Sequence, residues 1–353
     1  NVRRLARLGA AINRVRFVLC GPAARRGCTL SVMNPATLWD NDRPTSLVEL
    51  PALARQMGIG RVFAKLENER PLGNFKALGG RVAVARALAK RPSLPKLICA
   101  SDGNHGLSVA AAAAKAGAKA TIYLPTSASP IRADRIESVG GVIHWVNGTY
   151  DDAVSAAAAA AAHGEGLLIP DTSPDPNDPV VEDVMAGYGL ITQELRTQLP
   201  AHPTHLFVQA GVGGLAAAMA HGLRDFLSDP RCFVIVEPES AACVSAALTA
   251  GHPVLIPGAL YTSAEMLSCG LASASAIKIL KQLDARSILV NEDQLQTTPT
   301  LLHNAGGPRT TPSGAAGLAG LLHAATDPTH RSNHHLTPSS TALVIITEGP
   351  TSP

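Results

Sequence analysis

The stretch at residues 74–80, NFKALGG, places a lysine where its amine can be reactive. Asn74 is a favoured N-cap residue, so the pattern predicts that Lys76 lies in the first turn of an amphipathic helix. The positive end of the helix dipole disfavours an ammonium ion there, which predicts a lowered pKa for the Lys76 amine. A neutral lysine amine is what Schiff-base chemistry with an aldehyde requires. The alternative is an ordinary solvated lysine.

Two aspartates stand directly after predicted strands. Asp102 lies in the loop at residues 101–106, SDGNHG, and Asp171 follows the strand Leu167–Pro170. An acid at such a place can move a proton or bind an amine, so both are candidate catalytic residues. The alternative for each is a turn-forming aspartate.

A glycine-rich loop at residues 211–216, GVGGLA, matches the dinucleotide pattern G-x-G-x-x-A. Glu237 ends the next predicted strand, where a ribose-binding acid can lie. The physical requirement is less specific, because glycines before a helix N-terminus suit any phosphate. A nicotinamide dinucleotide, another phosphorylated cofactor and a turn without a ligand therefore all remain possible at this point.

Short apolar runs alternate with alanine-rich helical segments from residue 60 onward. The predicted strands are Val62–Leu66, Leu97–Ala100, Thr121–Leu124, Val142–Val146, Leu167–Pro170, Leu206–Gln209, Phe233–Val236 and Ala342–Ile346. The predicted helices are Phe75–Lys90, Leu107–Ala116, Pro130–Val139, Asp151–His163, Val180–Leu199 and Leu215–Phe226. Alternation of this kind, with strands apolar on both faces, predicts an α/β fold of open, mainly parallel twisted sheets flanked by helices. Ligands bind beyond the carboxyl ends of such strands, where the loops above lie.

Composition limits the functional classes. The 353 residues include 30 basic and 27 acidic side chains, a balance that gives no reason to expect a nucleic-acid partner. No apolar run approaches the ~20 residues that span a bilayer, so we expect a soluble, cytoplasmic protein without a membrane partner. The six cysteines form no C-x-x-C pair, and no metal site is expected. The first 39 residues hold seven arginines and no acid, which we interpret as a basic surface segment, with an organelle transit sequence as the alternative.

Several motifs in order along the chain resemble one family. They are NFK with Gly79-Gly80, DGNHG at 102–106, QAGVG at 209–213, VEP at 236–238, SGA at 313–315 and ITEG at 346–349. Together they resemble the pyridoxal 5'-phosphate enzymes of the tryptophan-synthase β fold type (fold type II), and among these the diaminopropionate ammonia-lyases. The resemblance covers about residues 34 to 350 and implies a homodimer. It also implies two lobes, a large cofactor-binding lobe at residues 1–77 plus 186–353 and a small lobe at 78–185.

The resemblance implies a role for each cofactor-site residue. Lys76 would bind pyridoxal phosphate through a Schiff base, and Phe75 would pack on its pyridine ring. Asn104 would donate to the 3'-oxygen, and Thr347 would meet the pyridine nitrogen. A neutral hydroxyl there leaves the nitrogen unprotonated, which suits elimination better than transamination. The phosphate would be held by the backbone amides of Gly211, Val212, Gly213, Gly214 and Leu215.

The implied reaction is α,β-elimination of D- or L-2,3-diaminopropionate to pyruvate and ammonia, so the partner is a small amino acid. Lys76 would remove the Cα proton of the L-isomer and Asp102 that of the D-isomer, from opposite faces. Asp171 matches a second catalytic carboxylate of the family. The substrate carboxylate would be held by Ser101, Asp102, Gly103 and His105.

Two departures from the family pattern leave the substrate open. Asp171 is followed by TSPDPNDP rather than by an aromatic and acidic stretch, and Thr311-Pro312 stands where a glutamate often precedes the SGA motif. Dehydration of a β-hydroxy amino acid, such as serine, threonine, 3-hydroxyaspartate or a phenylserine, is one alternative, and amino acid racemisation is another. A nicotinamide oxidoreductase that uses residues 211–237, and a binding protein without catalysis, are the remaining two.

Overall fold

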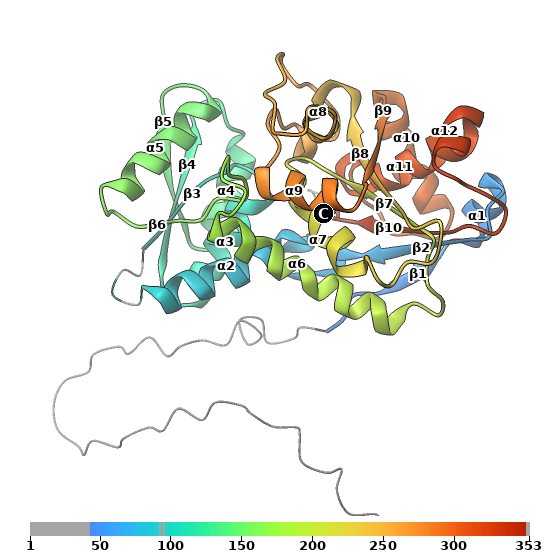
Figure 1. Cartoon of the computed structure of the whole chain (residues 1–353). Helices are drawn as coiled ribbons and strands as arrows, with labels where there is room; N and C mark the ends of the chain where they lie inside the picture. Colours follow the sequence, from blue (N-terminus) through green and yellow to red (C-terminus); the bar gives the residue numbers. More distant parts are fainter. Residues whose placement is uncertain (1–42, 92, 94–95, 351–353) are drawn as a thin grey trace, which may run out of the picture. The chain divides into compact units, whose positions relative to one another are not determined.

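Two sheets form the framework of the part of the chain that the structure describes (Figure 1). This part of the computed structural model comprises residues 43–91, 93 and 96–350, so the arginine-rich segment lies outside it. The first sheet has the strand order β1-β2-β10-β7-β8-β9 and the second the order β5-β4-β3-β6. The strands are β1 Leu47–Glu49, β2 Arg61–Leu66, β3 Lys96–Ala100, β4 Lys119–Pro125, β5 Gly141–Val146, β6 Leu167–Leu168, β7 His205–Gln209, β8 Cys232–Pro238, β9 Arg286–Val290 and β10 Thr341–Ile346. All paired strands are parallel except β1, which is antiparallel to β2, and this confirms the predicted α/β class.

The six predicted helices are all present. The helices are α1 Pro51–Met57, α2 Lys76–Lys90, α3 Asn104–Lys115, α4 Pro130–Ser138, α5 Tyr150–Ala162, α6 Pro179–Gln198, α7 Gly214–Leu223, α8 Cys243–Ala250, α9 Ala274–Gln282, α10 Glu292–Asn304, α11 Pro312–Thr326 and α12 Pro328–Asn333, with short 3-10 turns η2 Glu67–Glu69, η3 Pro71–Gly73, η4 Glu239–Ala241 and η5 Glu265–Leu267. The largest differences from prediction are that α3 begins at Asn104 rather than at Leu107 and that α7 ends at Leu223 rather than at Phe226.

Alternating side chains of the central strands enter two different cores. In β7, Leu206 and Val208 pack with the helices α2, α6 and α7, whereas Phe207 between them packs with α10 and α11 on the other face. Because successive side chains of a strand point to opposite faces, a strand covered on both sides must be apolar throughout. In the four-stranded sheet, α5 covers one face through a cluster that includes Ile98 and Ala157 (Figure 1).

Two strands were missing from the prediction, and one was too long. β1 has three residues, and β9 begins with the polar pair Arg286-Ser287 at the edge of the sheet, so neither has a continuous apolar run. β6 ends at Leu168 rather than at Pro170. Ile169 still donates to the Ile98 carbonyl, but a proline has no N–H with which to continue the ladder.

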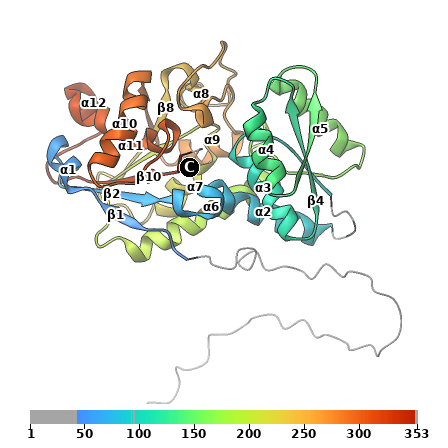
Figure 2. The same ribbon diagram turned by 180° about the vertical axis from the view of Figure 1, so that it is seen from behind.

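The strands of the four-stranded sheet all fall within residues 96–168, whereas the larger sheet takes β1 and β2 from before this range and the rest from after it. The proposed lobe boundaries, 77/78 and 185/186, pass through α2 and α6, which lie side by side (Figure 2). They remain a proposal. Among the helices of the described residues, none is long and apolar enough to span a membrane.

Candidate active site

The predicted site residues lie at the carboxyl ends of parallel strands in both sheets. Lys76 follows β2 through η2 and η3, while Asp102 follows β3 and Asp171 follows β6. The glycine loop at 211–214 follows β7, and Thr347 follows β10. The topology therefore brings these loops to the edges where α/β sheets bind ligands.

Lys76 and Asp171 form an ion pair, with 2.6 Å between Nζ and a carboxylate oxygen. Asn74 Oδ1 accepts a hydrogen bond from the Lys76 amide and so orients the start of α2, although the N-cap residue is Phe75 rather than the predicted Asn74. Phe75 lies beside the amine, with its ring centroid 5.6 Å from Nζ. The Tyr188 ring packs against Phe75 at 5.0 Å between centroids.

The predicted lowering of the Lys76 pKa was wrong. Burial is the largest single influence and lowers this pKa, but the charge and hydrogen bond of Asp171, together with Tyr188 and Cys269, outweigh burial and raise it. Burial alone would raise the pKa of Asp171, yet Lys76 lowers it well below its usual range. In the protein without cofactor the pair is therefore an ammonium and a carboxylate. The sequence prediction considered only the helix dipole and did not include the carboxylate of Asp171, which is 95 residues away in the chain.

The loop after β3 is tightly folded. A Cβ on Gly106 would lie 2.1 Å from the Ser101 carbonyl oxygen, so only glycine fits there. Ser101 Oγ accepts a hydrogen bond from the Gly103 amide at 3.3 Å. The His105 ring is buried, and its Nε2 donates to the Ile169 carbonyl at 2.9 Å. This ring therefore ties the loop to the end of β6.

Asp102 pairs with an arginine that the sequence analysis did not single out. Arg132 Nη1 donates to its carboxylate at 2.8 Å. Asp102 and Asp171 both lie near the Tyr150 phenol, since both carboxylates help to raise its pKa. No sequence signal marked Arg132, because it lies on α4 and belongs to none of the motifs.

The glycine loop presents unpaired amides at the start of α7. Within the described residues, the amides of 211–215 donate no hydrogen bond to the protein. Gly213 has a φ of +94°, which glycine adopts without strain. A Cβ on Gly211 would lie 2.9 Å from Cys269 Sγ, and this thiol also interacts electrostatically with Lys76. The loop and Lys76 thus belong to one site, and free amides at a helix N-terminus suit a phosphate.

The Thr347 hydroxyl is oriented by Gln209. Thr347 is 4% exposed, and its Oγ1 accepts a hydrogen bond from Gln209 Nε2 at 3.0 Å. In the described part of the chain this hydroxyl donates to no acceptor, so its proton is available to a ligand atom. A hydroxyl that accepts from an amide and donates onward fits an unprotonated pyridine nitrogen.

A buried glutamate, Glu348, holds Asn104. Asn104 Nδ2 donates to one carboxylate oxygen and Thr311 Oγ1 to the other, both at 2.5 Å. Burial raises the pKa of Glu348, and these two hydrogen bonds oppose that effect. Glu348 belongs to the ITEG motif and could have been suspected from its position after Thr347, although its partners could not.

Glu237 does not serve a dinucleotide. It is fully buried, and its two oxygens accept from the amides of Val244 and Ser245 at 2.7 Å. Burial raises its pKa to about 8, although these amide bonds oppose that effect. Because the carboxylate caps α8, it cannot reach a ribose, and the nicotinamide interpretation of residues 211–237 was wrong.

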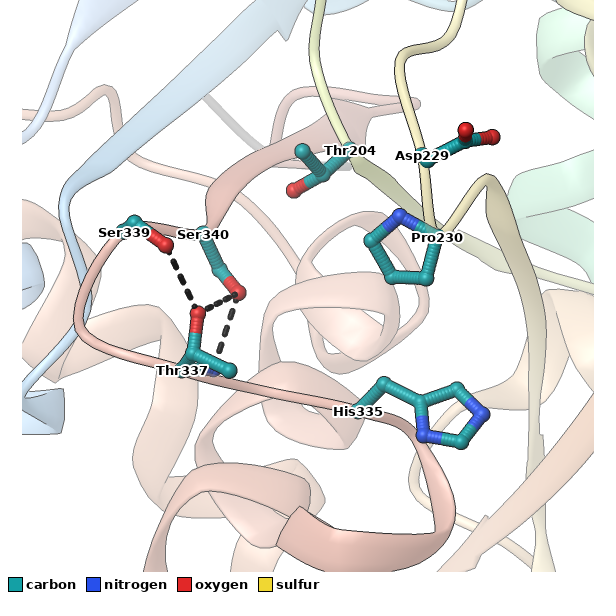
Figure 3. A pocket seen from close by; sticks show the side chains of 7 residues that line it. All are labelled: Thr204, Asp229, Pro230, His335, Thr337, Ser339 and Ser340. Atoms are coloured by element: carbon teal, nitrogen blue, oxygen red, sulfur yellow. Dashed lines mark hydrogen bonds between the residues drawn. The ribbon is translucent and has the colours of Figure 1, made fainter.

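A pocket of about 410 Å³ lies at the opposite, amino-terminal edge of the large sheet (Figure 3). Thr204, which lines it, precedes β7, and Thr337, Ser339 and Ser340, which also line it, precede β10. The Thr337 hydroxyl forms hydrogen bonds with the Ser339 and Ser340 hydroxyls there. This pocket takes no part in the site around Lys76.

Comparison with known proteins assigns this site to a family. Residues 38–348 match the family model described as pyridoxal-phosphate dependent enzyme. The chain belongs to this family of pyridoxal-phosphate dependent enzymes. The diaminopropionate ammonia-lyase of Salmonella typhimurium is 32% identical, and the alignment covers 88% of this chain and 86% of the relative. The biosynthetic L-threonine dehydratase of Escherichia coli is 30% identical over 81% of this chain and 53% of its own length.

Solved structures agree with the sequence comparison. The diaminopropionate ammonia-lyase of Escherichia coli, in complex with an aminoacrylate-PLP azomethine reaction intermediate, aligns with a TM-score of 0.81 at 29% identity. That alignment covers 90% of this chain and 87% of the other. The same enzyme in complex with D-serine gives a TM-score of 0.80.

The residues of this site fit pyridoxal phosphate. The amides of 211–215 and the positive φ of Gly213 suit its phosphate, and the partly buried Lys76 amine suits its aldehyde. The Thr347 hydroxyl is available to its ring nitrogen. The individual assignments of Phe75, Asn104, Thr347 and the loop amides to cofactor atoms remain predictions.

Replacing Asp171 with asparagine should lower the pKa of Lys76. The substitution removes the carboxylate that raises this pKa and leaves the burial that lowers it. More neutral amine then exists at pH 7, so pyridoxal phosphate should attach to the cofactor-free variant faster than to the wild type. Stopped-flow absorbance across pH measures this rate. An unchanged pH dependence would show that Asp171 does not control the amine, and Asp175→Asn, at an exposed turn nearby, serves as the control.

Replacing Gly213 with alanine should weaken pyridoxal phosphate binding about tenfold, since a displaced loop amide loses a charge-assisted hydrogen bond to the phosphate worth roughly 1.5 kcal/mol. The new Cβ would also lie 3.2 Å from side chains of Ala276 and Val244, which shifts the loop amides. Gly306→Ala is a matched control, because Gly306 has a φ of +91° and a Cβ added there would meet nothing within 4 Å. Both variants should lose similar stability, and equal cofactor affinity in the two would refute the loop's role. Cofactor titration and thermal denaturation measure the two quantities.

Proposed function

We propose that this pyridoxal-phosphate dependent enzyme is a carbon–nitrogen lyase that converts 2,3-diaminopropionate and water into pyruvate and two molecules of ammonia. The observation that carries the proposal is the Lys76–Asp171 pair in a site with a second carboxylate, Asp102, on another loop. The diaminopropionate ammonia-lyases are similar over most of both chains, which supports the same substrate.

When bound, pyridoxal phosphate supplies an electron sink that stabilises negative charge at the substrate Cα. Lys76 would hold the cofactor through its aldehyde group, and its Nζ, when free, would take the Cα proton of the L-isomer. Asp171 lies 2.6 Å from that nitrogen, where it orients the amine and exchanges a proton with it. The proton that the base takes from Cα would pass to the leaving β-amine, which departs as ammonia.

In this proposal Asp102 removes the Cα proton of the D-isomer. Its carboxylate comes from the loop after β3, whereas Lys76 comes from α2, so the two bases sit on separate elements. Residues 101, 102, 103 and 105 hold the substrate carboxylate. The neutral Thr347 hydroxyl keeps the ring nitrogen unprotonated, which favours elimination over transamination.

We further infer that the enzyme is a cytoplasmic homodimer whose lobes divide as predicted from the sequence. The order of its motifs, which resembles that of the ammonia-lyases, supports this inference. Light scattering coupled to size-exclusion chromatography tests the dimer, and a mass of one 36.4 kDa chain would contradict it.

Product ratios test the proposed reaction. The purified enzyme loaded with pyridoxal phosphate is given D- or L-2,3-diaminopropionate, and pyruvate and ammonia are both quantified. Two ammonia molecules per pyruvate support the ammonia-lyase. Turnover restricted to serine or threonine, with one ammonia per oxo acid, would favour the dehydratase, which the similarity to threonine dehydratase makes the second candidate. Isomer interconversion without pyruvate would indicate a racemase.

A further inference from the structure

Arg132 joins two carboxylates from different parts of the chain. Its Nη1 donates to Asp102 at 2.8 Å, and its Nη2 donates to Glu265 of η5. The Arg132 and Asp102 side chains are only 24% and 29% exposed, whereas Glu265 is 69% exposed. The guanidinium is therefore held at both ends, with its better buried contact at Asp102.

The η5 segment lies against the loop that carries Asp102. The Met266 amide donates to Ser313 Oγ at 3.1 Å, which fixes η5 to the start of α11. A Cβ on Gly103 would lie 3.3 Å from Met266 Sδ, so the two segments are in close contact. Arg132 thus connects α4, the 101–106 loop and η5, and these contacts leave Asp102 little freedom to rotate.

The positive charge of Arg132 reduces the repulsion between Asp102 and the substrate carboxylate. The loop expected to hold the substrate carboxylate also carries the Asp102 carboxylate, and two like charges in one place repel. A guanidinium at hydrogen-bond distance neutralises Asp102 and leaves its second oxygen available. Substrate can then bind beside an acid that still accepts a proton.

We propose that Arg132 is a positioning residue that orients and neutralises Asp102 for reaction of the D-isomer. This inference rests on the proposed function, in which Asp102 is the base for that isomer. Loss of Arg132 would therefore raise KM for both isomers, which carry the same carboxylate, but would lower kcat for the D-isomer alone.

The test compares Arg132→Gln, Arg132→Lys and Arg61→Gln with D- and L-2,3-diaminopropionate. Arg61 is a matched control, since it forms a bidentate pair with Glu49 on the large sheet and lies in no part of the site. In Arg132→Gln we expect kcat for the D-isomer to fall about 10- to 100-fold, the range of a lost charge-assisted hydrogen bond. We expect kcat for the L-isomer and the pyridoxal phosphate Kd to stay within about twofold.

Arg132→Lys keeps the charge but not the fork of donors, so KM should recover for both isomers while kcat for the D-isomer recovers only in part. Equal loss of kcat for both isomers, or an unchanged ratio of D to L turnover, would overturn the assignment. A wild-type enzyme that turns over neither isomer would instead overturn the proposed function and the inference with it.

Discussion

Lys76→Ala should abolish covalent binding of pyridoxal phosphate and lower elimination activity by about 10³-fold or more, because one amine serves as the attachment point and as a base. Asp171, the group at 2.6 Å, is a carboxylate and cannot form a Schiff base in its place. Absorbance spectra and borohydride reduction followed by peptide mapping measure attachment, and pyruvate formation measures activity.

Lys90→Ala is the matched control for this substitution. Lys90 lies at the other end of α2, is 62% exposed and pairs with Asp183. It should keep activity and cofactor binding within about twofold of the wild type, as surface substitutions do. A borohydride adduct on another lysine, or turnover by Lys76→Ala close to that of the wild type, would contradict the assigned role of Lys76.

Local sequence was sufficient to find the segments that form the site. Lys76, Thr347 and the 211–214 loop each follow an apolar strand, and parallel strands all end at the same edge. The continuous apolar runs of β7 and β10 were equally informative about strand positions, because both faces of these strands are buried. Edge strands such as β9 lack this signal, since they pair with one neighbour and tolerate polar residues.

What local sequence could not supply is the partner of each polar group. The sign of the Lys76 pKa shift depends on Asp171, and the orientation of Asp102 depends on Arg132, 30 residues further along the chain. Glu348 and Asn104 are 244 residues apart. Such pairs form only after both sheets are assembled, so no pattern within a single segment predicts them.

Glu194→Gln should destabilise the fold by about 3–5 kcal/mol, the usual effect of removing one partner from a buried ion pair. Glu194 lies on α6, and its Oε2 accepts from Lys65 Nζ at 2.5 Å and from Arg70 Nη2 at 2.7 Å. Lys65 at the end of β2 is fully buried, so the glutamine variant leaves its ammonium with only neutral acceptors, the Thr45 carbonyl and the Gln198 side-chain oxygen. Urea denaturation at constant cofactor concentration measures the change.

The difference in free energy of unfolding between the wild type and Glu194→Gln should become smaller as pH is raised. Burial already lowers the pKa of Lys65, and Glu194 is the first of the charges that oppose this effect. Without Glu194 the pKa falls further below the unfolded value of about 10.4. Between these two values the unfolded chain binds more protons than the native one, so the free energy of unfolding rises with pH up to about 10.

Glu49→Gln is the control for Glu194→Gln, because it also replaces a paired glutamate but leaves the buried ion pair intact. Glu49 also pairs with an arginine, Arg61, but the pair is exposed on the edge strand β1, so its loss should cost less than about 1 kcal/mol. If Glu194→Gln were no more destabilising than Glu49→Gln, or if its deficit did not depend on pH, Lys65 would not be charged in the native protein. The link between β2 and α6 would then rest on packing rather than on an ion pair.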